Sequence, residues 1–141
     1  MRRSVLEELL DAELAAIQAS LGQSSSVRAW RGGSDILVAF EADRNGAPGV
    51  FRLSCDQFDA EPPSVAMLDP QARTELPHEH WTPGVSNGGH PLTSKPFVCL
   101  QGVAEYHSHP SHTSDSWDRY RYRFRLTQTV RRLLEKAGVT P

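Results

Sequence analysis

The sequence has only two cysteines among its 141 residues, and its apolar runs fall well short of the roughly 18 residues that span a bilayer. Two cysteines are too few for the disulfide framework typical of small secreted proteins. Acidic residues interrupt the first leucine-rich segment, unlike in a secretory signal: Glu7, Glu8, Asp11 and Glu13. The formal net charge of −2 provides no general attraction to nucleic acid. We therefore expect a cytoplasmic protein with neither nucleic-acid nor membrane partners.

Basic residues are concentrated in the last part of the chain. Residues 119–141 contain seven of the 15 Lys and Arg residues but one of the 17 Asp and Glu residues, a local net charge of +6. Four arginines occupy alternate positions: Arg119, Arg121, Arg123 and Arg125. On a helix, alternate positions spread around the cylinder instead of forming one stripe. The pattern predicts a solvated helix face or a docking surface for an acidic partner.

The first segment has the signals of an amphipathic helix over residues 5–21. Ser4 and Glu7 have the spacing of a capping box. Apolar residues then recur at helical spacing: Leu6, Leu9, Leu10, Leu14, Ile17 and Leu21. Gly22 follows as a C-terminal stop.

Four short segments of strand character follow, separated by glycine- and proline-containing turns: residues 27–31, 36–41, 50–55 and 65–68. In the third of them, Phe51, Leu53 and Cys55 alternate with polar residues, which predicts that these three side chains face the core. Because consecutive strands joined by short turns pair as neighbours, the segments predict an antiparallel meander.

Residues 70–115 have no regular pattern, and all six histidines lie between positions 78 and 112. A long irregular stretch inside a compact domain is usually functional or disordered, and its aromatic and histidine residues favour function. Apolar residues from Trp117 to Ala137 then recur at helical spacing before Gly138. The sequence thus predicts one α+β domain over residues 1–141: a helix, a four-stranded antiparallel meander, a long active-site loop and a C-terminal helix packed on the sheet.

This order of elements resembles the ubiquitin-conjugating enzyme (UBC-like) family. The strings Gly49–Leu53, Phe58 and Glu61–Val65 are similar to the third strand of that family and to its double-proline entry into the fourth strand. His90-Pro91, nine residues before Cys99, resembles the motif that precedes the family's catalytic cysteine. The resemblance covers roughly residues 4–137.

The resemblance implies that Cys99 is a catalytic residue. Cys99 then accepts a ubiquitin-like modifier from an activating enzyme as a thioester and transfers it to an amine or another acceptor of a target protein. No cofactor is implied for this chain, because ATP is used by the activating enzyme. The resemblance also implies that the N-terminal helix contacts that enzyme.

The sequence departs from the family pattern in three places. Leu92 occupies the position of the asparagine that supports the oxyanion, for which Asn87, Thr93 or a histidine are the candidate substitutes. The family's last two helices are expected to be missing. The segment after Cys99 is unusually rich in histidine. Together these features resemble divergent bacterial members from ubiquitin-like conjugation operons, which implies a role in antiviral defence.

A thiol suits acyl transfer because thiolate is both a strong nucleophile and a good leaving group. His107 is the predicted base, since a histidine titrates in the useful range. Asp115 and Asp118 are predicted to orient such a base or to attract a lysine, and Asp118 is the one assigned to the catalytic set. His90 completes that set, chiefly as part of a turn that shapes the loop.

Two other interpretations remain open. Glu105–Pro110 is similar to the histidine-x-histidine-proline core of JAMM-type zinc isopeptidases, which implies a catalytic zinc on His107 and His109 with both imidazoles on a strand. A structural zinc held by His107, His109, His112 or Cys99 is a related prediction. The third interpretation is a UBC-like interaction module that has lost catalysis.

Overall fold

The computed structural model describes residues 4–24 and 26–141. Its first element is helix α1, Val5–Leu21, in agreement with the predicted range. Ser4 Oγ accepts a hydrogen bond from the Glu7 N–H at 3.1 Å, and the Glu7 carboxylate accepts one from the Ser4 N–H at 3.2 Å. This capping box satisfies donors that the first helical turn otherwise leaves unpaired.

Four strands form one antiparallel sheet in the order β1-β2-β3-β4, which confirms the predicted meander. They are β1 Val27–Gly32, β2 Asp35–Phe40, β3 Gly49–Ser54 and β4 Ser64–Leu68. The register pairs Val38 with both Ala29 and Phe51, and Phe51 with Met67. These four side chains share one face of the sheet and are buried, so this face carries the core.

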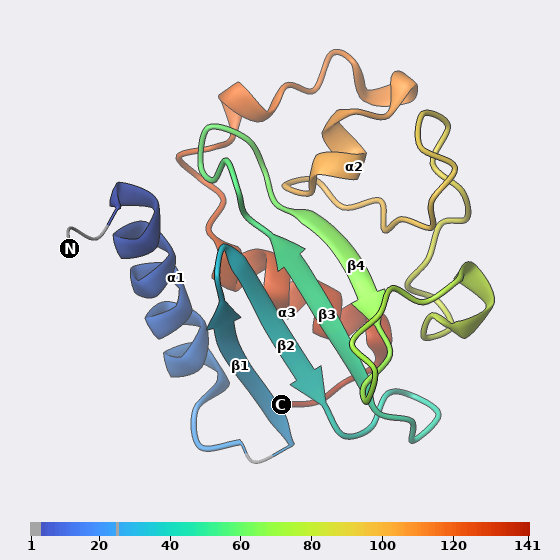
Figure 1. Ribbon diagram of the computed structural model, residues 1–141. Helices are drawn as coiled ribbons and strands as arrows, with labels where there is room; N and C mark the ends of the chain where they lie inside the picture. The colour runs from blue at the N-terminus through green and yellow to red at the C-terminus, as the bar shows by residue number, and fades with distance from the viewer. Residues whose placement is uncertain (1–3, 25) are drawn as a thin grey trace.

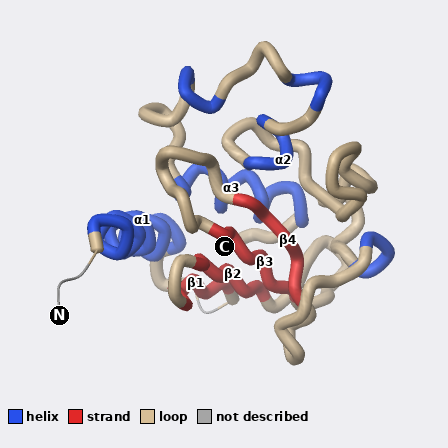
Figure 2. Tube along the Cα trace, turned by 45° about the horizontal axis from the view of Figure 1, so that its top comes forward, coloured by secondary structure: helices blue, strands red, loops and turns tan. Residues whose placement is uncertain are grey.

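Two long helices flank the sheet. Helix α3, Leu126–Ala137, crosses the core face, whereas α1 lies beside the edge strand β1 (Figures 1 and 2). Leu133 and Leu134 of α3 are buried in the same cluster as the core face of the sheet. Within the described ranges, no helix has the length and hydropathy needed to cross a membrane.

The long segment between β4 and α3 contains only short helical turns, as its irregular sequence predicts. These are η1 His78–His80, α2 Ala104–His107, η2 Pro110–His112 and η3 Trp117–Arg119. The segment packs beside β4 (yellow to orange in Figure 1). Apolar side chains along it join the main core: Trp81, Val85, Val98, Leu100, Val103 and Trp117. The loop is therefore a packed part of the fold and can hold side chains in fixed positions.

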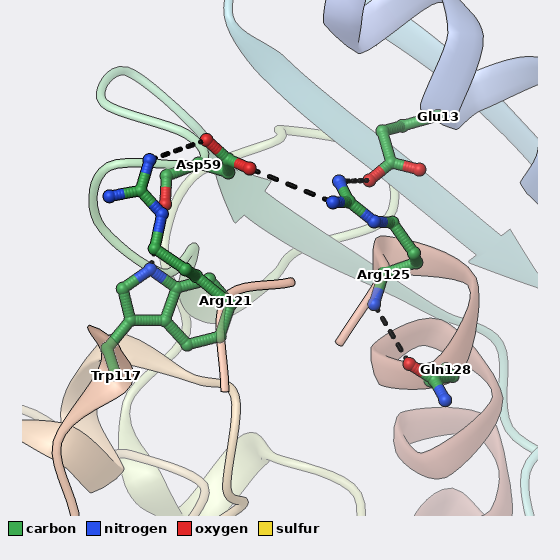
Figure 3. Close-up of polar contacts among 6 residues, drawn as sticks. All are labelled: Glu13, Asp59, Trp117, Arg121, Arg125 and Gln128. Carbon is green, nitrogen blue, oxygen red and sulfur yellow. Dashed lines mark hydrogen bonds and ion pairs between the residues drawn. The ribbon is translucent and has the colours of Figure 1, made fainter. Parts of the chain in front are cut away.

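The predicted start of the C-terminal helix at Trp117 is wrong, because α3 begins at Leu126. Residues 117–125 form η3 and turns instead, held by contacts to the loop after β3 (Figure 3). The Trp117 indole N–H donates to the Asp59 carbonyl at 2.8 Å, and Arg121 Nη2 donates to Asp59 Oδ1 at 3.1 Å. These tertiary contacts outweigh the helical periodicity of the segment.

Arg125 marks the boundary between this segment and α3 (Figure 3). Its guanidinium lies 3.2 Å from Glu13 Oε1 of α1 and 3.8 Å from Asp59 Oδ2. Its backbone N–H donates to Gln128 Oε1 at 2.9 Å, which caps the first turn of α3. Arg119 and Arg123 are exposed as predicted, but Arg121 and Arg125 bind carboxylates of the fold, so the predicted solvated face holds only in part.

Candidate active site

The two cysteines lie in different environments. Cys55 is only 1% exposed, and its thiol donates to the Leu53 carbonyl at 3.4 Å. Burial raises the pKa of Cys55 to about 12, with further contributions from Asp35 and Asp56. Cys99 lies in the loop and is half-buried. Cys55 is thus the core residue that the alternation predicts, and Cys99 is the thiol that can meet another molecule.

Residues on both sides of Cys99 in the sequence contact it. The Cys99 N–H donates to Asn87 Oδ1 at 2.9 Å, across twelve residues of chain. Asn87 is held by backbone pairing, because its N–H donates to the Phe97 carbonyl at 2.7 Å. On the other side, His112 Nε2 lies 3.6 Å from Cys99 Sγ. A thiol beside an imidazole is the basic unit of nucleophilic cysteine chemistry.

His112 is held by an aromatic contact. It ends the turn η2, and its ring stacks on Tyr106 of α2 with 4.0 Å between centroids and 16° between planes. The His109 ring lies 5.5 Å away on the same turn. The stacking limits rotation of the imidazole and keeps Nε2 near the sulfur of Cys99.

Asp115 connects the parts of this cluster. Its Oδ2 accepts from the Tyr106 hydroxyl at 2.5 Å and from Gln101 Nε2 at 2.9 Å, and Tyr120 is a further donor to the carboxylate. These donors, Tyr106 foremost, lower the pKa of Asp115 to about 2. The same hydrogen bond raises the pKa of Tyr106 to about 12. Asp115 is therefore ionised and Tyr106 is a protonated donor throughout the physiological range.

His90 lies on the N-terminal side of Cys99 in the long segment, and its ring nitrogens bind backbone groups instead of the Cys99 thiol. The ring is 2% exposed, and its Nδ1 accepts from the Leu92 N–H at 3.1 Å. The proton on Nε2 is then free to be donated to the Glu105 carbonyl, 2.9 Å away. Glu105 in turn accepts from the Val65 N–H of β4 at 2.9 Å. His90 thus shapes the loop, as the predicted turn implies.

His107 and Asp118, the predicted base and one predicted orienting residue, lie elsewhere in the cluster. The Gly102 N–H donates to His107 Nε2 at 3.0 Å, and His107 Nδ1 donates to the Asp115 carbonyl at 2.8 Å. Both ring nitrogens are therefore used by backbone groups. Asp118 is exposed in η3, where its N–H donates to Ser116 Oγ at 3.3 Å. The structure places His112, not His107, at the sulfur.

The histidines predicted to hold zinc are not arranged as a metal site. His107 ends the helix α2 and His109 precedes η2, so the strand expected for this pair is absent from this part of the described chain. His109 Nδ1 accepts from the Ser111 N–H at 3.1 Å. Over residues 4–24 and 26–141, no three His, Cys, Asp or Glu side chains gather as ligands.

A comparison with known families points to the same part of the chain. The model of the Y4jH-like family (Y4jH family) matches residues 89–136, about a third of the sequence. The matched segment includes Cys99, His112 and Asp115 and extends into α3. No curated protein matches the sequence.

The sequence pattern did not single out His112 or Tyr106 as partners of Cys99. His112 is 13 residues from Cys99, a separation at which sequence spacing predicts no contact. The signal available was the six-residue separation of an aromatic and a histidine in a loop rich in both. It becomes informative only once α2 and η2 are folded and bring the two rings into contact.

Proposed function

We propose that the protein is a ubiquitin-conjugating-type acyl carrier with a UBC-like fold. The observation that carries the proposal is the pairing of the half-buried Cys99 thiol with His112 at 3.6 Å, on a loop packed against a helix–meander–helix frame. The order of motifs around Cys99 supports the same assignment. Its partners are an activating enzyme, a ubiquitin-like modifier and a target protein, in the bacterial cytoplasm and in a pathway of antiviral defence.

The first reaction is a transthioesterification. The thiolate of Cys99 attacks the carbonyl carbon of the modifier's thioester on the activating enzyme, and the thiolate of that enzyme leaves. In the second reaction an acceptor amine attacks the new thioester and the Cys99 thiolate leaves. His112 takes the proton of the Cys99 thiol before the first step and gives it to the departing thiolate, so that the neutral imidazole can take the proton of the incoming amine in the second step. No redox step is involved, and ATP is consumed by the activating enzyme alone.

Both reactions pass through a tetrahedral intermediate with a negative oxygen, which needs hydrogen-bond donors. Leu92 has no side-chain donor and is 67% exposed. Asn87 Oδ1 is fixed by the Cys99 N–H, so the amide NH₂ on the same side chain is held close to the reacting residue. We assign the oxyanion support to Asn87.

The direct test combines the protein with its activating enzyme, modifier and ATP and analyses the products on non-reducing gels. We expect an adduct that thiols remove and that Cys99→Ala abolishes. Cys55→Ala is the matched control and forms the adduct normally, because Cys55 is in the core. Absence of any thiol-sensitive adduct contradicts the proposal, and retained binding to the modifier without an adduct identifies an interaction module instead.

A further inference from the structure

Tyr106 and Asp115 form a clamp around the histidine that contacts Cys99. The Asp115 carboxylate accepts from the Tyr106 hydroxyl at 2.5 Å, and the Tyr106 ring stacks on His112 at 4.0 Å. Gln101, two residues after Cys99, donates to the same carboxylate at 2.9 Å. The Asp115 carboxylate therefore connects the segment that contains Cys99 with the turn that contains His112.

His112 needs such support because of its position in the fold. It lies at the end of a three-residue turn, η2, flanked by exposed residues on both sides: Ser111 and Thr113. An imidazole on such a turn is free to rotate into solvent unless another group holds it. The titratable groups that face it are Cys99, Tyr106 and His109, with Asp115 behind Tyr106.

We propose that Tyr106 and Asp115 are positioning residues that hold the His112 imidazole against Cys99 and so keep the thiol reactive near neutral pH. The proton moves from Cys99 Sγ to His112 Nε2, leaving a thiolate beside an imidazolium. The inference deepens the proposed function, because it concerns the same thiol. It requires only that Cys99 be a nucleophile.

Whether removal of Asp115 slows or speeds the reaction of Cys99 distinguishes a positioning role from a direct electrostatic effect on the thiol. A carboxylate close to a thiol disfavours the thiolate, so removing Asp115 speeds thiol chemistry if the charge acts on Cys99 directly. If Asp115 acts through Tyr106 and His112, its removal slows that chemistry instead. The two mechanisms predict opposite changes for the same substitution.

The test measures alkylation of Cys99 by iodoacetamide in the full chain, with peptide mass spectrometry to distinguish Cys99 from Cys55. The readout is the ratio of the rate near pH 7 to the rate near pH 9.5, where an ordinary cysteine is largely thiolate. We expect His112→Ala to lower this ratio about five- to tenfold. Asp115→Ala also lowers this ratio, but it causes no further decrease when His112→Ala is already present.

Conservative variants sharpen the result. Asp115→Asn keeps an oxygen that accepts from Tyr106 and restores most of the ratio, whereas Tyr106→Phe keeps the ring but loses the anchor and lowers the ratio. Glu79→Ala, which removes an exposed carboxylate elsewhere in the irregular segment, leaves it unchanged. If Asp115→Ala unfolds the protein, Cys55 becomes reactive, and the comparison of Tyr106→Phe with wild type decides.

The inference is overturned if Asp115→Ala raises the ratio or leaves it unchanged, or if it lowers the ratio equally with and without His112. None of these measurements uses an activating enzyme or a modifier. A normal alkylation pattern without a thioester therefore contradicts the acyl-carrier function alone, and a thioester without the expected pattern contradicts the clamp alone.

Discussion

Cys55 and Cys99 have the same side chain but lie in surroundings that favour different reactivity. Cys55 is enclosed by the core, where its thiol donates to the Leu53 carbonyl. Cys99 is half-buried and adjoins the side chains of His112 and Asn87. Because the thiolate is the reactive form, burial makes Cys55 inert and leaves Cys99 as the nucleophile that we propose.

The raised pKa of Cys55 makes stability depend on pH. The folded state favours the protonated thiol up to a pKa of about 12, whereas a cysteine in an unfolded chain titrates at about 8.5. The stabilisation is complete below about pH 8.5 and is lost as the pH rises towards 12. Between about pH 7 and pH 10 we expect a loss of about 2 kcal/mol in the free energy of unfolding. Urea unfolding at both pH values measures this loss.

Cys55→Ala is the control for this prediction, because it has no thiol to titrate. The variant is less stable at pH 7 but has a smaller difference between the two pH values than wild type. An equal pH dependence in both proteins shows that other groups, such as Tyr106, cause it.

Asn87 offers a second prediction at the scale of one residue. Asn87→Asp keeps an oxygen for the Cys99 N–H but loses the amide donors. We expect the folded structure and the Cys99 position to persist, while transfer from Cys99 to an amine slows by about 10²-fold or more. Single-turnover discharge of the preformed thioester measures this rate.

Thr93→Ala tests the other candidate for the same role. Thr93 Oγ1 accepts from the Lys95 N–H at 3.3 Å, a contact that serves the local turn. Discharge therefore proceeds at the wild-type rate in this variant. If discharge is slow in Thr93→Ala and has the wild-type rate in Asn87→Asp, the oxyanion support belongs to Thr93 instead of Asn87.

At the scale of elements, the start of α3 depends on contacts that join distant parts of the chain. Glu13 of α1 is 6% exposed, and Arg125 Nη1 lies 3.2 Å from it. The second terminal nitrogen, Nη2, lies 3.8 Å from Asp59 Oδ2. The arginine thus compensates a buried charge as well as preceding a helix.

Removal of this arginine leaves the Glu13 carboxylate buried without its cation. We expect Arg125→Ala to lower the free energy of unfolding by about 2 kcal/mol, less than for a fully buried pair because the Arg125 side chain is 40% exposed. Chemical denaturation measures the loss. Arg123→Ala, at an exposed position, stays within about 0.5 kcal/mol of wild type. Equal losses in the two variants contradict the role of the pair.

The elements that were predictable are those specified by neighbouring residues. The capping box of Ser4 and Glu7 determines where α1 begins, and the alternation of Phe51, Leu53 and Cys55 identifies the buried face of β3. The segment after Trp117 also has a helical period, but its conformation depends on Asp59, which lies far away in sequence. Periodicity contains no information about such partners.

At the scale of the whole molecule, the long loop and the sheet share one core. Val98 and Val103 are fully buried in the same cluster as Leu53 of β3 and Leu133 of α3. A loop with such packing does not melt separately from the sheet. The site and the fold are therefore expected to be lost together.

This expectation is tested by following urea unfolding with two probes. The test uses Trp30→Phe, which removes the tryptophan of β1. Fluorescence of this variant reports on Trp81 and Trp117 of the loop segment, and its far-UV circular dichroism reports on the helices and the sheet. The two transitions are expected to coincide at one midpoint. A fluorescence change at lower urea concentration contradicts the shared core.

The parts of the site that the sequence could predict are those that depend on the order of motifs along the chain. Cys99 and the turn at His90 stand in an order that a motif search can follow. The contact with His112 depends on the short turns α2 and η2 that lie between it and Cys99, and these turns have no periodic signal in the sequence. His107 was the nearest histidine with a plausible spacing, but its nitrogens bind the Gly102 N–H and the Asp115 carbonyl.

The contacts of Asn87 and His112 with Cys99 also have a consequence for protein synthesis. Asn87 precedes Cys99 by twelve residues and His112 follows it by 13. Cys99 therefore leaves the ribosome before His112 does, and Trp117, which lies buried in the core, leaves later still. Until His112 follows, Cys99 has no imidazole beside it, and we expect it to react as an ordinary thiol. The proposed pairing of thiol and imidazole can therefore form only after the segment up to Trp117 has emerged.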